Sequence, residues 1–211
     1  MELVGQVPNG KLCDLGCDDG SWTTELTARW ANPRLYGVEI VASRADIARA
    51  RGIEVAVLDL SQPLPFLDGE MDVVHANQVI EHVTDVDQFM SEIQRILQIG
   101  GAAVISTENG SSWHNIFAAL MGWQIFSATN VSKRSPGLGN PLATRRGSSP
   151  APASWTHKTI FNFRGLTELA EVHGLKVVKV MGAGYYPLPA SVGHFDPRHA
   201  HFLALKAVKR A

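Results

Sequence analysis

One short segment sets the expected architecture of this chain: Lys11-Leu12-Cys13-Asp14-Leu15-Gly16-Cys17-Asp18-Asp19-Gly20. It is an apolar run that ends in an acid and continues through a glycine-containing turn into a helix-like stretch. Gly16 allows a close approach of the backbone to a ligand, and Gly20 lets the chain turn into a helix whose amino end faces that ligand. The segment therefore predicts a site for a nucleotide-shaped ligand at the carboxyl end of a first parallel strand.

Strands and helices are expected to alternate through the first half of the chain. The patterns predict strands at 11–14, 35–38, 53–58, 71–76 and 102–106, and helices at 22–30, 43–51 and 86–97. The clearest helix carries an apolar stripe formed by Val86, Phe89, Met90, Ile93, Ile96 and Leu97, and Gly100-Gly101 is expected to break it. A helix at 164–173 and strands at 175–181 and 201–208 follow near the end of the chain. The fold class is therefore α/β, with a doubly wound, mostly parallel seven-stranded sheet and an antiparallel C-terminal strand.

Length and composition are those of one soluble domain. The 211 residues are 45% hydrophobic, and we expect a single domain over residues 1–211 with an insertion at about 109–161. We expect no membrane span, and the first ten residues are too polar for a signal peptide. Only Cys13 and Cys17 occur, which favours a reducing compartment and a cytoplasmic location.

Polar residues follow four successive predicted strands. Asp14, Glu39, Asp59 and Asn77 each stand where a strand is expected to end. Ligands of open α/β sheets bind beyond the carboxyl ends of the strands. A carboxylate at Glu39 is suited to accept two hydrogen bonds from vicinal ribose hydroxyls. Each acid alone could equally be a helix cap or a loop acid, but the ordered set indicates a binding edge.

These segments resemble those of the class I S-adenosylmethionine-dependent methyltransferases, and most closely the type 11 group. The resemblance rests on residues 12–20, 36–39, 58–60, 72–83 and 100–107. It implies S-adenosyl-L-methionine as cofactor, with S-adenosyl-L-homocysteine as product. It also implies a cofactor site built from Asp14, Gly16, Cys17, Gly20, Glu39, Asp59, Leu60, Asn77 and Gln78.

Two details of the first turn bear on this resemblance. Asp18 replaces the usual middle glycine, so its side chain must point away from the ligand if the turn keeps its geometry. The spacing from Gly16 to Gly20 lacks the full G-x-G-x-x-G pattern of dinucleotide-binding folds. With Glu81-His82-Val83 after the fourth strand, this spacing favours methyl transfer over NAD binding.

The segment at about 109–161 is expected to be a lid or an insertion. Trp113, Ile116, Phe117, Leu120 and Met121 form an apolar helix face, which we expect to pack on the sheet or to close over the site as a lid. A membrane-surface helix is the alternative. Residues 127–154 are rich in Pro, Gly and Ser and are expected to be a mobile loop. No acid lies between Glu108 and Glu168, so an anionic partner is expected, with Arg145, Arg146 and Trp113 as substrate-binding residues.

Two histidines are candidates for catalysis. His82, after the fourth strand, is the first candidate for a general base, and His157, at the return from the insertion, is the second. A structural role for His82 is an equally good interpretation. His199 and His201, with His194 and Asp196 upstream, have the composition of a metal cluster, but the pair is expected on a terminal strand far from the cofactor edge, so no metal is expected.

Two functions from different classes remain open at this point. The first is a methyltransferase acting on a small molecule, on an oxygen of an anionic or lipid- or sugar-linked acceptor. The second is a non-catalytic module that keeps the cofactor fold and uses the basic insertion to hold a partner or a membrane. Nucleic acid is not the expected partner, because no RNA-binding module is recognisable. Oligomeric state does not follow from the sequence.

Overall fold

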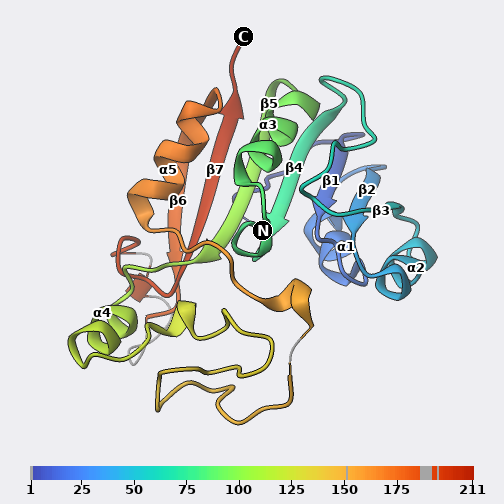
Figure 1. The fold of residues 1–211 in the computed structure, drawn as a ribbon. Helices are drawn as coiled ribbons and strands as arrows, with labels where there is room; N and C mark the ends of the chain where they lie inside the picture. Colours follow the sequence, from blue (N-terminus) through green and yellow to red (C-terminus); the bar gives the residue numbers. More distant parts are fainter. Residues whose placement is uncertain (1, 151, 186–191, 194) are drawn as a thin grey trace.

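A computed structural model describes residues 2–150, 152–185, 192–193 and 195–211. Within them one seven-stranded sheet has the order β3-β2-β1-β4-β5-β7-β6, and β7 runs in the direction opposite to the other six strands (Figure 1). The strands are β1 Lys11–Leu15, β2 Arg34–Glu39, β3 Glu54–Val57, β4 Met71–Asn77, β5 Leu97–Glu108, β6 Leu175–Ala183 and β7 Phe202–Lys209. The helices are α1 Ser21–Thr27, α2 Ala42–Ala50, α3 Val86–Ile96, α4 Trp113–Leu120 and α5 Phe163–Val172, with short 3-10 turns η1 Ile80–His82, η2 Phe126–Ala128 and η3 Ala153–Trp155. The predicted seven-stranded α/β fold is confirmed.

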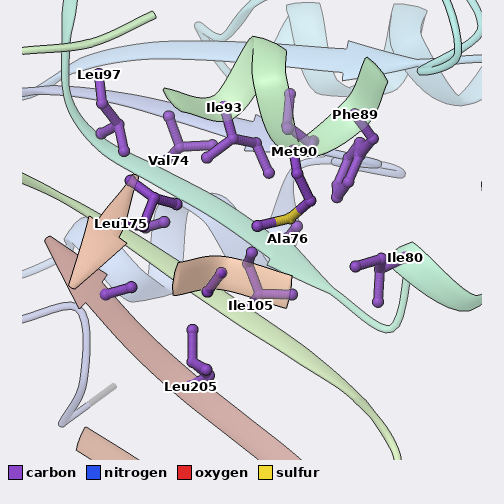
Figure 2. Packing of buried hydrophobic residues seen from close by; sticks show 14 of the residues in the cluster. Val74, Ala76, Ile80, Phe89, Met90, Ile93, Leu97, Ile105, Leu175 and Leu205 are labelled. Atoms are coloured by element: carbon purple, nitrogen blue, oxygen red, sulfur yellow. The ribbon is translucent and has the colours of Figure 1, made fainter. Parts of the chain in front are cut away.

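The core lies on the face of the sheet covered by α3 and α5. Phe89, Met90, Ile93 and Ile96 of α3 are buried, as the predicted stripe requires, and Figure 2 shows α3 side chains against those of β4 and β5. Alternate residues of the strands face the other side, where Leu12, Val73 and Val104 pack with Leu26 and Trp30 next to α1. The period-two alternation of the strands thus separates two apolar layers, one on each face.

The end of α3 differs from the prediction. The helix ends at Ile96, and β5 begins at Leu97, before the two glycines that were expected to separate them. Met71 pairs with Leu97 while Val73 pairs with Ala102, so the strand pairing shifts register across this stretch. Gly100 has a φ of 81°, which glycine adopts without the steric cost of a side chain. The two glycines therefore lie at an irregularity within β5, and they do not mark the end of α3.

The apolar face of α4 is largely exposed, so the expectation that it packs on the sheet is wrong, while its role as a lid stays a prediction. Trp113 is 47% exposed and Leu120 is 81% exposed, and Figure 1 shows α4 away from the sheet. The helix instead buries Asn115, whose amide donates to the carbonyl of Asn109 at 2.9 Å and to Ser127 Oγ at 2.8 Å. A buried amide needs these partners, so they hold the helix with its apolar side outward.

Candidate functional site

Two pockets adjoin at the carboxyl edge of the parallel strands. We call the first, of about 620 Å³, the strand-edge pocket; it is lined by the ends of β2 and β4, by the loops after β1 and β3, and by residues of the insertion. We call the second, of about 730 Å³, the insertion pocket, because residues of the 109–161 segment form most of its wall. The two share Gln78, His82 and Trp155. A molecule in one pocket therefore lies next to a molecule in the other.

Glu39 ends β2 in the wall of the strand-edge pocket and is 9% exposed. Its Oε2 accepts a hydrogen bond from the Asp18 backbone N–H at 3.0 Å, and its Oε1 accepts one from the Val41 N–H at 2.8 Å. A carboxylate has about four lone-pair sites, so acceptor capacity remains for two further donors. The side chain both ties the first loop to β2 and offers a negative charge to the pocket.

The turn after β1 keeps a backbone path that glycine favours. Gly16 has a φ of 75° and a Cβ on it would lie 2.6 Å from Val79 Cγ2, so no other residue fits this wall. Asp18, at the position of the missing glycine, has a φ of 47°, and Asp tolerates this left-handed region better than most residues. Its carboxylate is bonded to Arg44 of α2, with a second contact of 2.6 Å, and this hydrogen bond lowers the pKa of Asp18. The Asp18 carboxylate is therefore held by a partner in α2.

Three of the residues expected to contact the cofactor do not line the pocket. Asp14 is buried, accepts from Thr23 Oγ1 at 2.5 Å and lies 2.7 Å from His75 Nδ1. The Cys17 side chain packs in an apolar cluster with Ala45, Ala48, Ile53 and Val55, and burial raises its pKa to about 12. Gly20 approaches α2 so closely that a Cβ would lie 3.0 Å from that of Ala48. These residues support the loop from behind.

The remaining predicted cofactor residues do line the strand-edge pocket. They are Gly16, Glu39, Asp59, Leu60, Asn77 and Gln78. Asp59 is exposed, and its Oδ1 accepts from the Ser61 N–H at 2.8 Å, which is the loop role that the sequence left open. Asn77 Oδ1 accepts from Ser106 Oγ at 2.5 Å. Gln78, with a φ of 57°, lies in the wall between the two pockets.

The two histidines proposed for catalysis meet in the insertion pocket. Their ring centroids lie 4.9 Å apart, although the residues are 75 positions apart in the chain. His82 Nδ1 lies 3.1 Å from the Thr156 carbonyl oxygen and His157 Nδ1 lies 2.6 Å from that of Ser127. Burial lowers the pKa of His82, which favours the neutral ring.

Sequence reasoning did not single out Glu81 as a pocket residue. Its side chain is 2% exposed, lines the insertion pocket and accepts from Thr107 Oγ1 at 2.9 Å. Burial raises its pKa to about 7. It stands beside His82 in the sequence, but nothing in the local pattern shows which side of η1 meets the insertion. Glu108, His114, Asn130, Trp155 and His201 also line this pocket without having been predicted.

Only one of the three predicted substrate-binding residues lines the insertion pocket. Arg145 does, with its guanidinium 5.1 Å from the centroid of the Trp155 ring. Arg146 does not line it. Trp113 stacks on His199 at 4.5 Å and donates to Tyr185 Oη at 2.5 Å, outside the pocket wall. The contacts with His199 and Tyr185 thus hold Trp113 outside the insertion pocket.

The histidines near the C-terminal strand lie in different environments. His201 lines the insertion pocket, where its ring centroid is 4.3 Å from that of His114. His199 Nδ1 lies 2.9 Å from Asp196 Oδ2, against Trp113. His194 lies outside the described residues. His201 thus lies in the insertion pocket and not in the strand-edge pocket, where the cofactor residues were expected.

His114 gives the pocket a pH-dependent contribution to stability. Burial, and secondarily the nearby His201, lowers its pKa to about 4. In the unfolded chain the His114 ring is protonated below about pH 6.5, whereas in the folded chain it stays neutral down to a pH near its lowered pKa. The contribution of His114 to stability is therefore complete above pH 6.5 and is lost as the pH falls toward 4. We expect the free energy of unfolding of the wild type to fall by about 2 kcal/mol more between pH 7 and pH 4 than that of His114→Phe. Urea unfolding of both proteins at several pH values measures this. If the free energy of unfolding depends on pH in the same way in both, the loss of stability at low pH comes from groups other than His114.

The volume and the lining residues of the strand-edge pocket fit S-adenosylmethionine. Its volume lies in the range of small-ligand sites, roughly 300–1,000 Å³. Glu39 keeps acceptor capacity for hydroxyl groups, and the wall at Gly16 leaves no room for a side chain. Leu58 and Leu60 provide apolar surface for a base.

Comparison with known proteins gives the family. A family model for the methyltransferase domain matches residues 2–180. A probable S-adenosylmethionine-dependent methyltransferase of Mycolicibacterium smegmatis is 29% identical over the whole chain, which spans 68% of that relative. A malonyl-[acyl-carrier protein] O-methyltransferase of Methylovorus is 30% identical over 51% of this chain and 39% of its own length. The chain thus spans well under two thirds of the second relative.

Solved structures share the fold at low sequence identity. A putative methyltransferase of Haloferax volcanii, in complex with its Trm112 activator, has a TM-score of 0.68 at 16% identity, covering 99% of this chain and 86% of its own. The geranyl diphosphate C-methyltransferase of Streptomyces coelicolor, bound to Mg²⁺, geranyl diphosphate and S-adenosyl-L-homocysteine, has a TM-score of 0.61 at 18% identity, covering 99% and 77%. With the family match over most of its length and a pocket that fits the cofactor, the chain belongs to the methyltransferase-domain family and is a class I S-adenosylmethionine-dependent methyltransferase.

Proposed function

We propose that this enzyme methylates an oxygen of a small acceptor that carries a negatively charged group. The observation that supports this most directly is the wall shared by the two pockets. An acceptor in the insertion pocket reaches the strand-edge pocket at Gln78, His82 and Trp155. Alignment of an acceptor with an electrophilic methyl group supplies much of the rate of such a transfer.

The chemistry asks two things of the protein. S-adenosylmethionine supplies the methyl group on a sulfonium; the acceptor oxygen gains it and loses its proton, and the electron pair of the S–CH₃ bond stays on sulfur. The chain must therefore place the acceptor and assist the loss of its proton. We propose that His82 and His157 act on the acceptor hydroxyl, because both line the insertion pocket and His82 reaches the shared wall.

Arg145 supports an anionic acceptor. It lines the insertion pocket, and the segment between Glu108 and Glu168 contains six basic residues and no acid. A guanidinium can bind a carboxylate or phosphate through two parallel hydrogen bonds. Of the four proteins compared above, the malonyl-[acyl-carrier protein] O-methyltransferase and the geranyl diphosphate C-methyltransferase are named for acceptors that carry an anionic group.

A lipid- or sugar-linked acceptor is the finer form of this proposal. The exposed apolar side chains of α4, among them Phe117 and Leu120, support a peripheral contact with a lipid. None of the described helices is long and apolar enough to cross a bilayer. We propose the cytoplasm as the location, because the two cysteines of the chain, Cys13 and Cys17, are buried and do not suggest a disulfide framework.

Arg145→Ala is expected to raise the KM for an anionic acceptor about tenfold, the loss of one charge-assisted hydrogen bond, with the affinity for S-adenosylhomocysteine unchanged. Arg146→Ala is the matched control, because it removes a charge at the neighbouring position, which does not line the insertion pocket. The KM of this variant should stay near that of the wild type. Steady-state kinetics with paired anionic and neutral acceptors measures this. An equal KM for both acceptors in the wild type would contradict the anionic class.

The cofactor is tested first by calorimetric titration with S-adenosylmethionine and S-adenosylhomocysteine. Micromolar binding of both is expected, and acceptors are then screened for methyl transfer by the release of S-adenosylhomocysteine. Failure of every hydroxylated anionic acceptor, in a sample that binds the cofactor, would reject the acceptor class proposed here.

A further inference from the structure

Glu81, His82 and His157 form a cluster in the insertion pocket that we call the Glu-His-His cluster. One oxygen or nitrogen atom of each side chain lies within 4.8 Å of the corresponding atoms of the other two. The first two residues belong to η1, after β4, and the third lies at the return from the insertion. A hydrogen bond of 2.7 Å from the Lys158 N–H to the Glu81 carbonyl oxygen holds the two segments together.

The hydrogen bonds of the cluster leave the same nitrogen free in both rings. His82 Nδ1 and His157 Nδ1 each face a backbone carbonyl oxygen, at 3.1 and 2.6 Å. A carbonyl oxygen only accepts, so each ring donates from Nδ1, and Nε2 is the nitrogen left to bind a metal ion. The backbone therefore sets the tautomer that a metal ligand requires.

The carboxylate is held in a matching way. Glu81 accepts from the Thr107 hydroxyl through Oε2, at 2.9 Å, and this bond leaves Oε1 as a further ligand atom. Imidazoles that donate their second N–H to a carbonyl, and carboxylates that accept from a neighbour, are the usual surroundings of metal ligands. All three residues of the cluster have such a partner.

We propose that the Glu-His-His cluster binds a divalent transition-metal ion such as Zn²⁺. Two imidazoles and one carboxylate suit zinc and its neighbours, whereas Mg²⁺ prefers a shell of oxygen atoms. Bonds of about 2.1 Å place tetrahedral ligand atoms roughly 3.4 Å apart, so the three side chains close inward on the ion. Three protein ligands at a pocket wall leave a position open for a water molecule or a substrate oxygen.

The role of the ion rests on the proposed function, and with the ion bound His82 and His157 act on the acceptor hydroxyl through the ion, because their Nε2 lone pairs then bind the metal and cannot take the proton themselves. A hydroxyl oxygen of the acceptor that takes the open position loses its proton to solvent more readily, because the ion stabilises the resulting negative charge. That oxygen then forms the bond to the methyl carbon, and the S–CH₃ electron pair returns to sulfur. The ion would also fix the acceptor beside His82, at the wall shared with the strand-edge pocket.

The test is metal binding by the full chain, freed of any purification tag and stripped with a chelator. Titration with Zn²⁺ is expected to show one site, and Co²⁺ is expected to give visible absorption bands of an ion bound by nitrogen and oxygen. His157→Phe should weaken Zn²⁺ binding at least 100-fold, and Mg²⁺ should not compete. His114→Phe is the matched control, because it removes another histidine of the same pocket and should keep the affinity.

Binding of S-adenosylhomocysteine by each variant reports whether the variant is folded. If His157→Phe does not fold, Glu81→Gln replaces it, since the amide keeps the shape and still accepts from Thr107. Absence of Zn²⁺ binding, or equal affinity in the wild type and the cluster variant, would overturn the metal site and leave the methyltransferase proposal intact. Zinc binding by the cluster together with unchanged methyl transfer in the stripped enzyme would overturn the role of the ion.

Discussion

An Asp14→Ala variant is expected to lose about 3 kcal/mol of its free energy of unfolding, because a buried pair loses one partner. Asp14 is 3% exposed and joins two elements: its carboxylate accepts from Thr23 of α1 and contacts His75 of β4 at 2.7 Å. Removal of the carboxylate leaves the Thr23 hydroxyl and the His75 imidazole in the interior without this hydrogen-bond partner. Urea unfolding at pH 7 measures the change.

Asp14→Asn is the control for size and shape. The amide oxygen keeps one acceptor for Thr23 or His75, so the variant should lie between the wild type and Asp14→Ala. Because Asp14 does not line the strand-edge pocket, the folded fraction of either variant should keep most of its affinity for S-adenosylhomocysteine. A large loss of that affinity with unchanged stability would mean that Asp14 contacts the cofactor, as the sequence predicted.

Glu39→Ala is expected to weaken S-adenosylmethionine binding by about 1.5–3 kcal/mol, roughly 10- to 150-fold, the scale of hydrogen bonds to a charged group. Part of the loss would be indirect, because the carboxylate also holds the Asp18 and Val41 N–H groups at 3.0 and 2.8 Å. Calorimetric titration with S-adenosylmethionine and S-adenosylhomocysteine measures it.

Two control variants separate the direct from the indirect part. Glu39→Gln keeps one oxygen for a backbone N–H but removes the charge, so an intermediate loss is expected. Asp59→Ala removes an exposed acid of the same pocket whose visible partner is the Ser61 N–H. An affinity of Glu39→Ala equal to that of the wild type would refute the ribose role of this residue.

Local pattern was sufficient for the sheet and the helices that cover it. The stripe of α3 could be read because 3.6-residue periodicity brings Phe89, Met90, Ile93 and Ile96 to one side of a helix that is long enough to show it. The same reasoning failed for α4, where a buried Asn115 outweighs an apolar stripe. Satisfying a buried amide is a property of the surroundings, and a helical pattern does not contain it.

The sequence by itself determined the fold class and the strand-edge pocket, because the residues of that pocket follow the ends of strands and parallel strands end at one edge. The tertiary structure decided the rest. It separated Arg145 from Arg146 and placed Asp14 and Cys17 behind the wall. It also brought Glu81 and His82 to His157 through a contact made at the far end of the insertion. Local pattern reports only on neighbours along the chain, whereas a contact across 75 residues depends on how the intervening segment packs.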